Sequence, residues 1–178
     1  MRQIVLLRGV NVGARNRVAM PALRELLAGA GCKDVSTYLQ SGNAVLSSAL
    51  APAQLGRMCE AQIKQELGLD IAVVARTRDE LAEVVKRDPL GDVADKPKLY
   101  QVSFCSAEPD EEAVRKVAER AVGGERLELR GREIYAWFPD GVGRSRLAAK
   151  LSRQALGVTV TARNWTTVVN LLELADRH

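Results

Sequence analysis

The residues best suited to binding chemistry follow the first apolar run of the sequence, in the polar loop RGVNVGARN at residues 8–16. Its two glycines allow the backbone to approach a ligand closely, and Arg8, Asn11 and Arg15 can donate hydrogen bonds to an anion. The loop lacks the glycine spacing of a Walker phosphate-binding loop or of a dinucleotide-binding fingerprint. An irregular turn without a ligand would use the same residue types.

Three further clusters of polar residues are candidates for binding an anion. The first suits a tight hairpin turn, the second leads into a helix whose first N–H groups favour anions, and the third precedes a final helix. Each cluster also has a purely structural explanation, as a turn or as a helix cap. The candidates are Ser41 and Asn43 in the segment QSGN, then Gly141, Gly143, Arg144 and Ser145, and finally Arg163 and Asn164.

Positive charge is concentrated in two parts of the sequence. Residues 1–24 contain five arginines and no acidic residue, and residues 126–163 contain eight basic and three acidic residues. We predict that the loops at residues 8–16 and 141–145 converge on one basic concavity, which would attract an anion. An ordinary arginine-rich surface would have the same composition.

The single histidine is the last residue, His178, where a side chain is usually mobile. We therefore expect neither an imidazole-based nucleophile system nor a histidine-ligated metal site. The three separated cysteines, Cys32, Cys59 and Cys105, indicate neither a disulfide framework nor a zinc site, and we expect them to be reduced and buried. No metal or cofactor is predicted. Any catalysis would use carboxylates, lysine, tyrosine, serine, backbone amides or a borrowed cofactor.

Hydrophobic periodicity in the first half predicts the β-α-β-β-α-β order of a ferredoxin-like fold, followed by one more helix. Residues 88–97 combine two prolines, a glycine and three acids without periodicity, so we predict a linker at residues 89–97. The predicted strands are residues 4–10, 35–40, 44–48 and 71–76, and the predicted helices are residues 20–30, 53–67 and 79–87.

The second half repeats the β-α-β-β order, with strands at 99–105, 126–130 and 134–138 and helices at 110–122, 145–156 and 165–175. Residues 158–161 are predicted to be a short extended piece. The predicted fold class is therefore α+β, with two βαββ-containing, ferredoxin-like subdomains that a duplication would explain. The N-terminal subdomain, residues 1–88, has the order βαββαβα, and the C-terminal one, residues 98–178, has the order βαββαα.

No apolar run approaches the roughly 20 residues that a membrane-spanning helix needs. The opening MRQIVLLRGVNVG lacks the cleavage pattern of a secretory signal, so we expect a cytoplasmic protein. Aromatic residues make up only 4% of the chain, which leaves few rings on which nucleic-acid bases could stack.

Four ordered segments spread along nearly the whole chain are RGVNVG, QSGN, GVGRSRL and TARNWTT. Together they resemble a bacterial family known only as the domain of unknown function DUF1697. Val10 and Ala14 depart mildly from the residues usual in its opening motif. The resemblance implies two α+β subdomains with ferredoxin-like features, and it implies no activity or catalytic residue, because none is established for the family.

The sequence leaves three hypotheses about function open. The first is a protein that binds an anionic ligand, such as a nucleotide, a phosphometabolite or a nucleic acid, through its basic glycine-containing loops. The second is an enzyme that acts on a small phosphorylated or carboxylated metabolite in a cleft between the subdomains. The third is a protein-interaction module, and the oligomeric state is not predicted.

Overall fold

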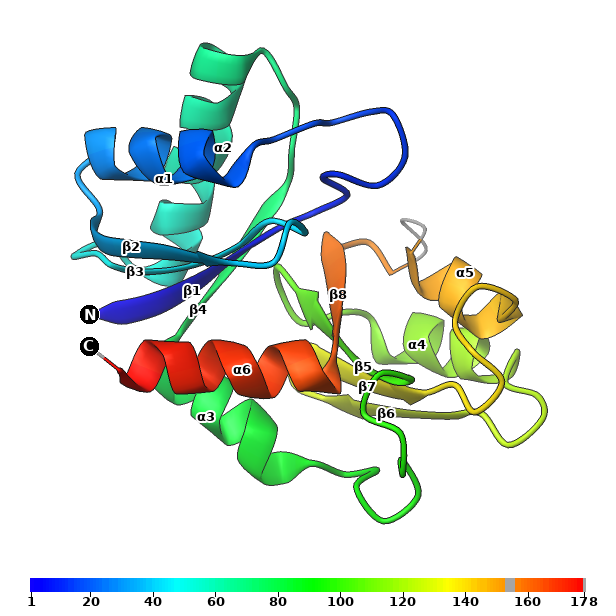
Figure 1. Cartoon of the computed structure of the whole chain (residues 1–178). Helices are drawn as coiled ribbons and strands as arrows, with labels where there is room; N and C mark the ends of the chain where they lie inside the picture. Colours follow the sequence, from blue (N-terminus) through cyan, green and yellow to red (C-terminus); the bar gives the residue numbers. More distant parts are fainter. Residues whose placement is uncertain (153–155, 178) are drawn as a thin grey trace. The chain divides into compact units, whose positions relative to one another are not determined.

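The computed structural model of the chain describes residues 1–152 and 156–177 and contains two four-stranded antiparallel sheets (Figure 1). The chain forms two compact units. One comprises Met1–Ala82 together with the end of the last helix, from Asn170 onward, and the other comprises Glu83–Val169. This grouping divides two helices, unlike the contiguous subdomains 1–88 and 98–178 that the sequence predicts. The division into subdomains 1–88 and 98–178 stays a prediction.

The first unit has the predicted βαββαβ order, with β1 in the middle of the sheet order β2-β3-β1-β4. Both faces of β1 are buried, and helices α1 and α2 cover one of them through an apolar core that includes Val5, Leu23 and Leu55. The elements are β1 (Arg2–Leu7), α1 (Met20–Gly29), β2 (Lys33–Tyr38), β3 (Asn43–Ser47), α2 (Pro52–Leu67) and β4 (Val73–Thr77), followed by α3 (Arg78–Arg87).

Local chemistry explains where these elements begin and end. Prolines in the first turns of α1 and α2 lose no helical hydrogen bond, because the N–H groups there have no partner in the helix. At the start of α2 the Gln54 side chain accepts from the Ala51 N–H at 3.2 Å. Strand β1 ends at Leu7, earlier than the predicted Val10, because Gly9 turns the chain with a φ of +64°.

The second unit repeats this topology, in the sheet order β6-β7-β5-β8. Helices α4 and α5 cover one face of its sheet through a core that includes Val114, Leu147 and Ile134. The elements are β5 (Tyr100–Cys105), α4 (Glu111–Ala118), β6 (Arg126–Arg130), β7 (Glu133–Trp137), α5 (Arg146–Ser152) and β8 (Val160–Asn164), followed by α6 (Trp165–Asp176).

The second half does not have the predicted βαββαα order, because it contains an additional strand, β8, between its last two helices. This strand pairs antiparallel with β5 from Val160 opposite Cys105 to Asn164 opposite Gln101, so the second unit is also βαββαβ. Thr161 and Arg163 are buried on one face of β8 although they are polar. The apolar alternation that marks a strand is therefore weak in this segment, and only its pairing with β5 defines it.

Helix α4 is shorter than the predicted 110–122. It ends at Ala118, and the next amides make i→i+3 bonds, from Arg120 to the Val117 carbonyl and from Ala121 to the Ala118 carbonyl. Such tightening is common in the last turn of a helix. The following glycines at residues 123 and 124 then leave helical geometry with positive φ. The predicted helix 145–156 begins after Ser145, and its residues 153–155 lie outside the described chain.

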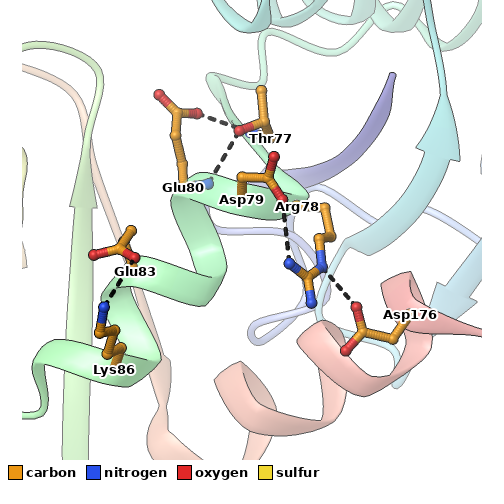
Figure 2. A network of polar contacts seen from close by, with 7 residues as sticks. All are labelled: Thr77, Arg78, Asp79, Glu80, Glu83, Lys86 and Asp176. Atoms are coloured by element: carbon orange, nitrogen blue, oxygen red, sulfur yellow. Dashed lines mark hydrogen bonds and ion pairs between the residues drawn. The ribbon is translucent and has the colours of Figure 1, made fainter.

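Each unit continues directly from its last strand into a helix that starts with a cap. At the start of α3 the Glu80 N–H donates to Thr77 Oγ1 at 3.1 Å, as Figure 2 shows. The Thr77 N–H in turn donates to Glu80 Oε2 at 2.8 Å. At the start of α6 the Thr167 N–H donates to Asn164 Oδ1 at 2.9 Å, which confirms the predicted cap. None of the helices in the described ranges is both long and apolar enough to cross a membrane.

Candidate functional site

Asn11 joins the loop after β1 to the turn between β2 and β3. Its Nδ2 donates to the carbonyls of Gln40 (2.5 Å) and Val18 (2.8 Å), and its Oδ1 accepts from the Val18 N–H (2.9 Å). Both donors of the side-chain amide are therefore used within the chain. Its φ of +55° is one that asparagine tolerates better than most residues. These three hydrogen bonds give Asn11 the role of holding the loop against the hairpin turn.

Gly42 brings the hairpin turn into direct contact with the first strand. Its carbonyl accepts from the Leu7 N–H at 2.8 Å, and its φ is +76°. A Cβ atom at this position would lie 2.6 Å from Val10 Cγ2 and 2.7 Å from Leu7 Cβ, so no larger side chain fits without movement. The turn and the β1–α1 loop are thus packed against one another rather than merely adjacent.

The two polar candidates in this turn also shape it. Asn43 is fully buried, and its Nδ2 donates to the Tyr38 carbonyl and to Ser41 Oγ, both at 2.9 Å. These bonds close the turn between β2 and β3. Ser41 itself is exposed at the surface beside Gln40, whose carbonyl accepts from Asn11.

The exposed part of the β1–α1 loop carries the charge. Arg15 and Arg17 are exposed and Arg8 is half-buried, with its backbone N–H donating to the Ala72 carbonyl at 2.9 Å. No acidic residue occurs in residues 1–24, so the local charge is positive. The structure therefore joins the two sequence motifs within the first unit through Asn11 and Gly42, and Arg8 and Arg15 belong to the loop that these contacts hold.

The cluster before α5 lies in the second unit and is built around a helix cap. Ser145 is buried, and its Oγ accepts from the Ala148 N–H at 3.0 Å, as the structural explanation predicts. Gly141 makes a turn with a φ of +94° and donates its N–H to the Phe138 carbonyl, whereas Gly143 and Arg144 are exposed. The convergence of this cluster with the loop at residues 8–16 stays a prediction.

The third cluster lies at the junction of β8 and α6. Arg163 is buried, and its Nη1 donates to Thr161 Oγ1 and to the Ala162 carbonyl, both at 2.8 Å. Burial lowers the pKa of this guanidinium to about 10. Next to it, the Trp165 ring stacks on Tyr100 with centroids 4.8 Å apart and planes 18° apart. Together with the Asn164 cap, these contacts give the cluster a structural explanation.

Two features of the molecule were missed by reasoning from the sequence. One is Gln40, whose carbonyl links the hairpin turn to Asn11, and no local pattern signals a contact made by a backbone oxygen. The other is a groove of about 520 Å³ between α4 and β6 in the second unit. The alternating sequence RLELR of β6, beside the amphipathic α4, was the available signal for it.

The cysteines are free and buried, as the sequence predicts. Burial raises the pKa of the Cys59 thiol to about 12, with smaller contributions from Cys32 and Glu60. Among residues 1–152 and 156–177, no three His, Cys, Asp or Glu side chains cluster as metal ligands would. His178, on which the sequence argument about imidazole chemistry depends, lies outside the described residues.

Comparison with known proteins identifies a family and similar folds, and it does not indicate an activity. The sequence model of a family described as "Protein of unknown function (DUF1697)" matches residues 1–135. No curated protein matches the sequence. Among solved structures, the chain is similar to the conserved bacterial protein SP0830 from Streptococcus pneumoniae, with 20% sequence identity, a TM-score of 0.79 and 98% of each chain covered. At this identity the likeness shows the fold alone.

Proposed function

The chain belongs to the DUF1697 family, and we propose that it binds a phosphate-bearing anion through the β1–α1 loop of its first unit. The observation that carries this proposal is that the loop is positively charged and is also held in place by hydrogen bonds. Arg8, Arg15 and Arg17 lie within a stretch that has no acidic residue, and Asn11 holds the same stretch to the hairpin turn. A supported loop loses less conformational entropy when it binds a ligand than a free one does.

The backbone of the loop supports the same proposal. Gly9, Asn11 and Gly13 all have positive φ, between +55° and +67°. N–H groups in turn conformations can form concavities that bind anions, and those of Arg8 and Asn11 take no part because they donate to the carbonyls of Ala72 and Asn16. Guanidinium groups then add charge-assisted hydrogen bonds to phosphate oxygens, which are stronger than hydrogen bonds between neutral groups. This chemistry is shared by nucleotides, phosphometabolites and the nucleic-acid backbone.

A thermal-shift titration followed by calorimetry tests the proposal. The probes are pyrophosphate, ATP and a short single-stranded oligonucleotide, each added to the full chain, because a ligand that binds the native state raises its melting temperature. The variant is the double substitution Arg15→Gln and Arg17→Gln. The matched control is Arg144→Gln with Arg146→Gln, which removes the same charge from exposed residues of the second unit.

The expected result is that at least one probe binds and that the first double variant weakens it by about tenfold or more, because each charge-assisted bond contributes substantially. If the control variant weakens binding equally, the two loops converge as the sequence predicts. If the oligonucleotide is the probe that binds, its affinity should fall steeply with salt, since counterions are released. If no probe raises the melting temperature, or if both double variants bind as the wild type does, the proposal is wrong.

A further inference from the structure

The groove beside β6 combines an apolar floor with a charged rim. Its walls come from one helix and one edge strand of the second unit, because β6 is the outermost strand in the sheet order β6-β7-β5-β8. Leu127 and Leu129 of β6 are half-buried and contribute apolar surface toward α4. The groove is lined by Val114, Ala118, Leu127 and Leu129, with Glu108, Pro109, Glu111, Arg115 and Gly131 around them.

The same strand has backbone groups directed away from its sheet. Strands β6 and β7 are closed by a two-residue turn, so the flanking residues Arg130 and Glu133 form a hydrogen-bonded pair. Antiparallel pairing alternates along the strands, which directs the peptide groups of Leu127 and Leu129 to the open side. The Leu129 carbonyl indeed accepts from Arg130 Nη1 at 2.9 Å, a side-chain donor. An edge of this kind can pair with an additional strand.

The charge pattern on β6 defines what that additional strand should be. On the face opposite to the two leucines, the strand presents Arg126, Glu128 and Arg130 in alternating sign. Directly opposed residues on neighbouring strands share a face and favour opposite charges. The complementary segment therefore reads acidic, apolar, basic, apolar, acidic, and its two apolar side chains face the groove.

The same pattern argues against a second copy of this chain as the partner. If two β6 strands paired antiparallel about their centres, Arg126 would face Arg130 and Glu128 would face its own copy. Like charges directly opposite one another destabilise a sheet. The guanidinium of Arg130 also covers the open Leu129 carbonyl, a device that protects an edge from indiscriminate pairing.

We propose that β6 and the α4–β6 groove form a docking site for an extended segment of another protein that alternates acidic, apolar, basic, apolar and acidic residues. The segment adds a fifth strand at the edge of the second sheet. Its main chain bonds to the peptide groups of Leu127 and Leu129, displacing the Arg130 guanidinium from the Leu129 carbonyl, and its apolar side chains fill the groove. This proposal is independent of the anion site in the first unit.

The test is an NMR titration of the full chain, labelled with nitrogen-15, with the capped peptide Thr-Glu-Leu-Lys-Leu-Glu-Thr. Three N-methyl derivatives of the peptide serve as matched controls. N-methylation of either leucine removes an N–H that faces β6, whereas N-methylation of the lysine alters a group that points away. We expect the unmodified peptide to shift the amide signals of β6 and α4, and the leucine N-methyl peptides to bind about tenfold more weakly. The lysine N-methyl peptide should bind as the unmodified one does.

A charge swap supplies a second, independent readout. Glu128→Lys should weaken the peptide about fivefold and favour a peptide with glutamate in place of its lysine, because the opposed charges become alike. Glu173→Lys, an equal change of charge on an exposed residue of α6, should leave both affinities unchanged. Equal binding by all the N-methyl peptides, signal shifts away from β6 and α4, absence of binding, or self-association of the chain through β6 would each overturn the proposal.

Discussion

The two units share their strand order but differ in the connections at one end of their sheets. The first strand of the first unit is followed by a long loop, residues 8–19, whereas residues 106–110 suffice in the second unit. The hairpin turns differ in the same way, because residues 39–42 join β2 to β3, while Gly131 and Arg132 alone join β6 to β7. In the first unit, hydrogen bonds from the Asn11 side chain join the longer loop to the longer hairpin turn.

Equivalent positions in the two sheets show how close the repeat is despite slight residue identity. The strand registers place Arg76 opposite Ile4 in one sheet and Arg163 opposite Val102 in the other, and both arginines are buried. Likewise buried Asn43 of β3 pairs with Leu6 of β1, and buried Glu133 of β7 pairs with Phe104 of β5. Leu6 and Phe104 occupy the same position in their strands. The framework is therefore common to both units, and the difference lies in the loops, where binding residues usually occur.

The largest expected effect comes from the two hairpin turns. Gly42→Ala should destabilise the protein by about 3 kcal/mol or more, because the new Cβ adds a clash with Val10 and Leu7 to the cost of a left-handed backbone. Gly131 also has a positive φ, +60°, but no atom lies within 4 Å of a Cβ built there. Gly131→Ala should therefore lower the free energy of unfolding by only about 1 kcal/mol. Urea unfolding measures both, and equal losses would contradict the packed contact between turn and loop.

The residue after the last strand distinguishes the units further. In the first unit this residue is Arg78, whose Nε forms an exposed ion pair with Asp176 Oδ1 at 2.6 Å (Figure 2). In the second unit it is Trp165, stacked on Tyr100. Trp165→Ala should cost about 2 to 3 kcal/mol, from lost burial and ring stacking. Arg78→Ala should change thermal unfolding much less, and a larger effect of Arg78→Ala would reverse this ranking.

The helix caps should behave alike in the two units. Thr77→Ala removes the side-chain acceptor for the Glu80 N–H, and Asn164→Ala removes the acceptor for the Thr167 N–H. Each should lower the free energy of unfolding by about 1 kcal/mol. Thr77→Ser, which keeps a capping hydroxyl, is the control and should retain most of the stability. If only one cap mattered in chemical denaturation, the α3 and α6 starts would not be equivalent.

The smallest effect concerns pH and the core of the first unit. Because burial raises the pKa of Cys59 above that of an unfolded thiol, the folded state holds this proton more tightly. The resulting stability is complete below the unfolded pKa near 9 and is lost as the pH rises toward 12; the loss by pH 9.5 should be less than about 1 kcal/mol. Unfolding at pH 8 and at pH 9.5 should therefore show a smaller loss for Cys59→Ala than for the wild type. Identical losses in both proteins would exclude Cys59 as the cause.

Most elements were predictable because their signals are local. Apolar periodicity, the prolines in the first turns of α1 and α2, and the glycine-containing turns indicated every helix and nearly every strand within a few residues. Strand β8 was the exception, since its buried Thr161 and Arg163 hide the alternation. In the candidate site, the sequence identified Arg8, Asn11 and Arg15 as a group, but it did not distinguish the residue that holds the loop from those that are exposed.

What the sequence by itself determined is the kind and order of the elements, the positive charge of the opening segment and the membership of a family, because all three depend on residue types and their spacing. The tertiary structure alone decided that β8 completes the second sheet, that Asn11 bonds to Gln40 across the hairpin, and that β6 is left as an open edge beside α4. Each of these depends on which backbone groups meet after folding. Backbone groups are the same in every residue, so a sequence pattern does not record their partners.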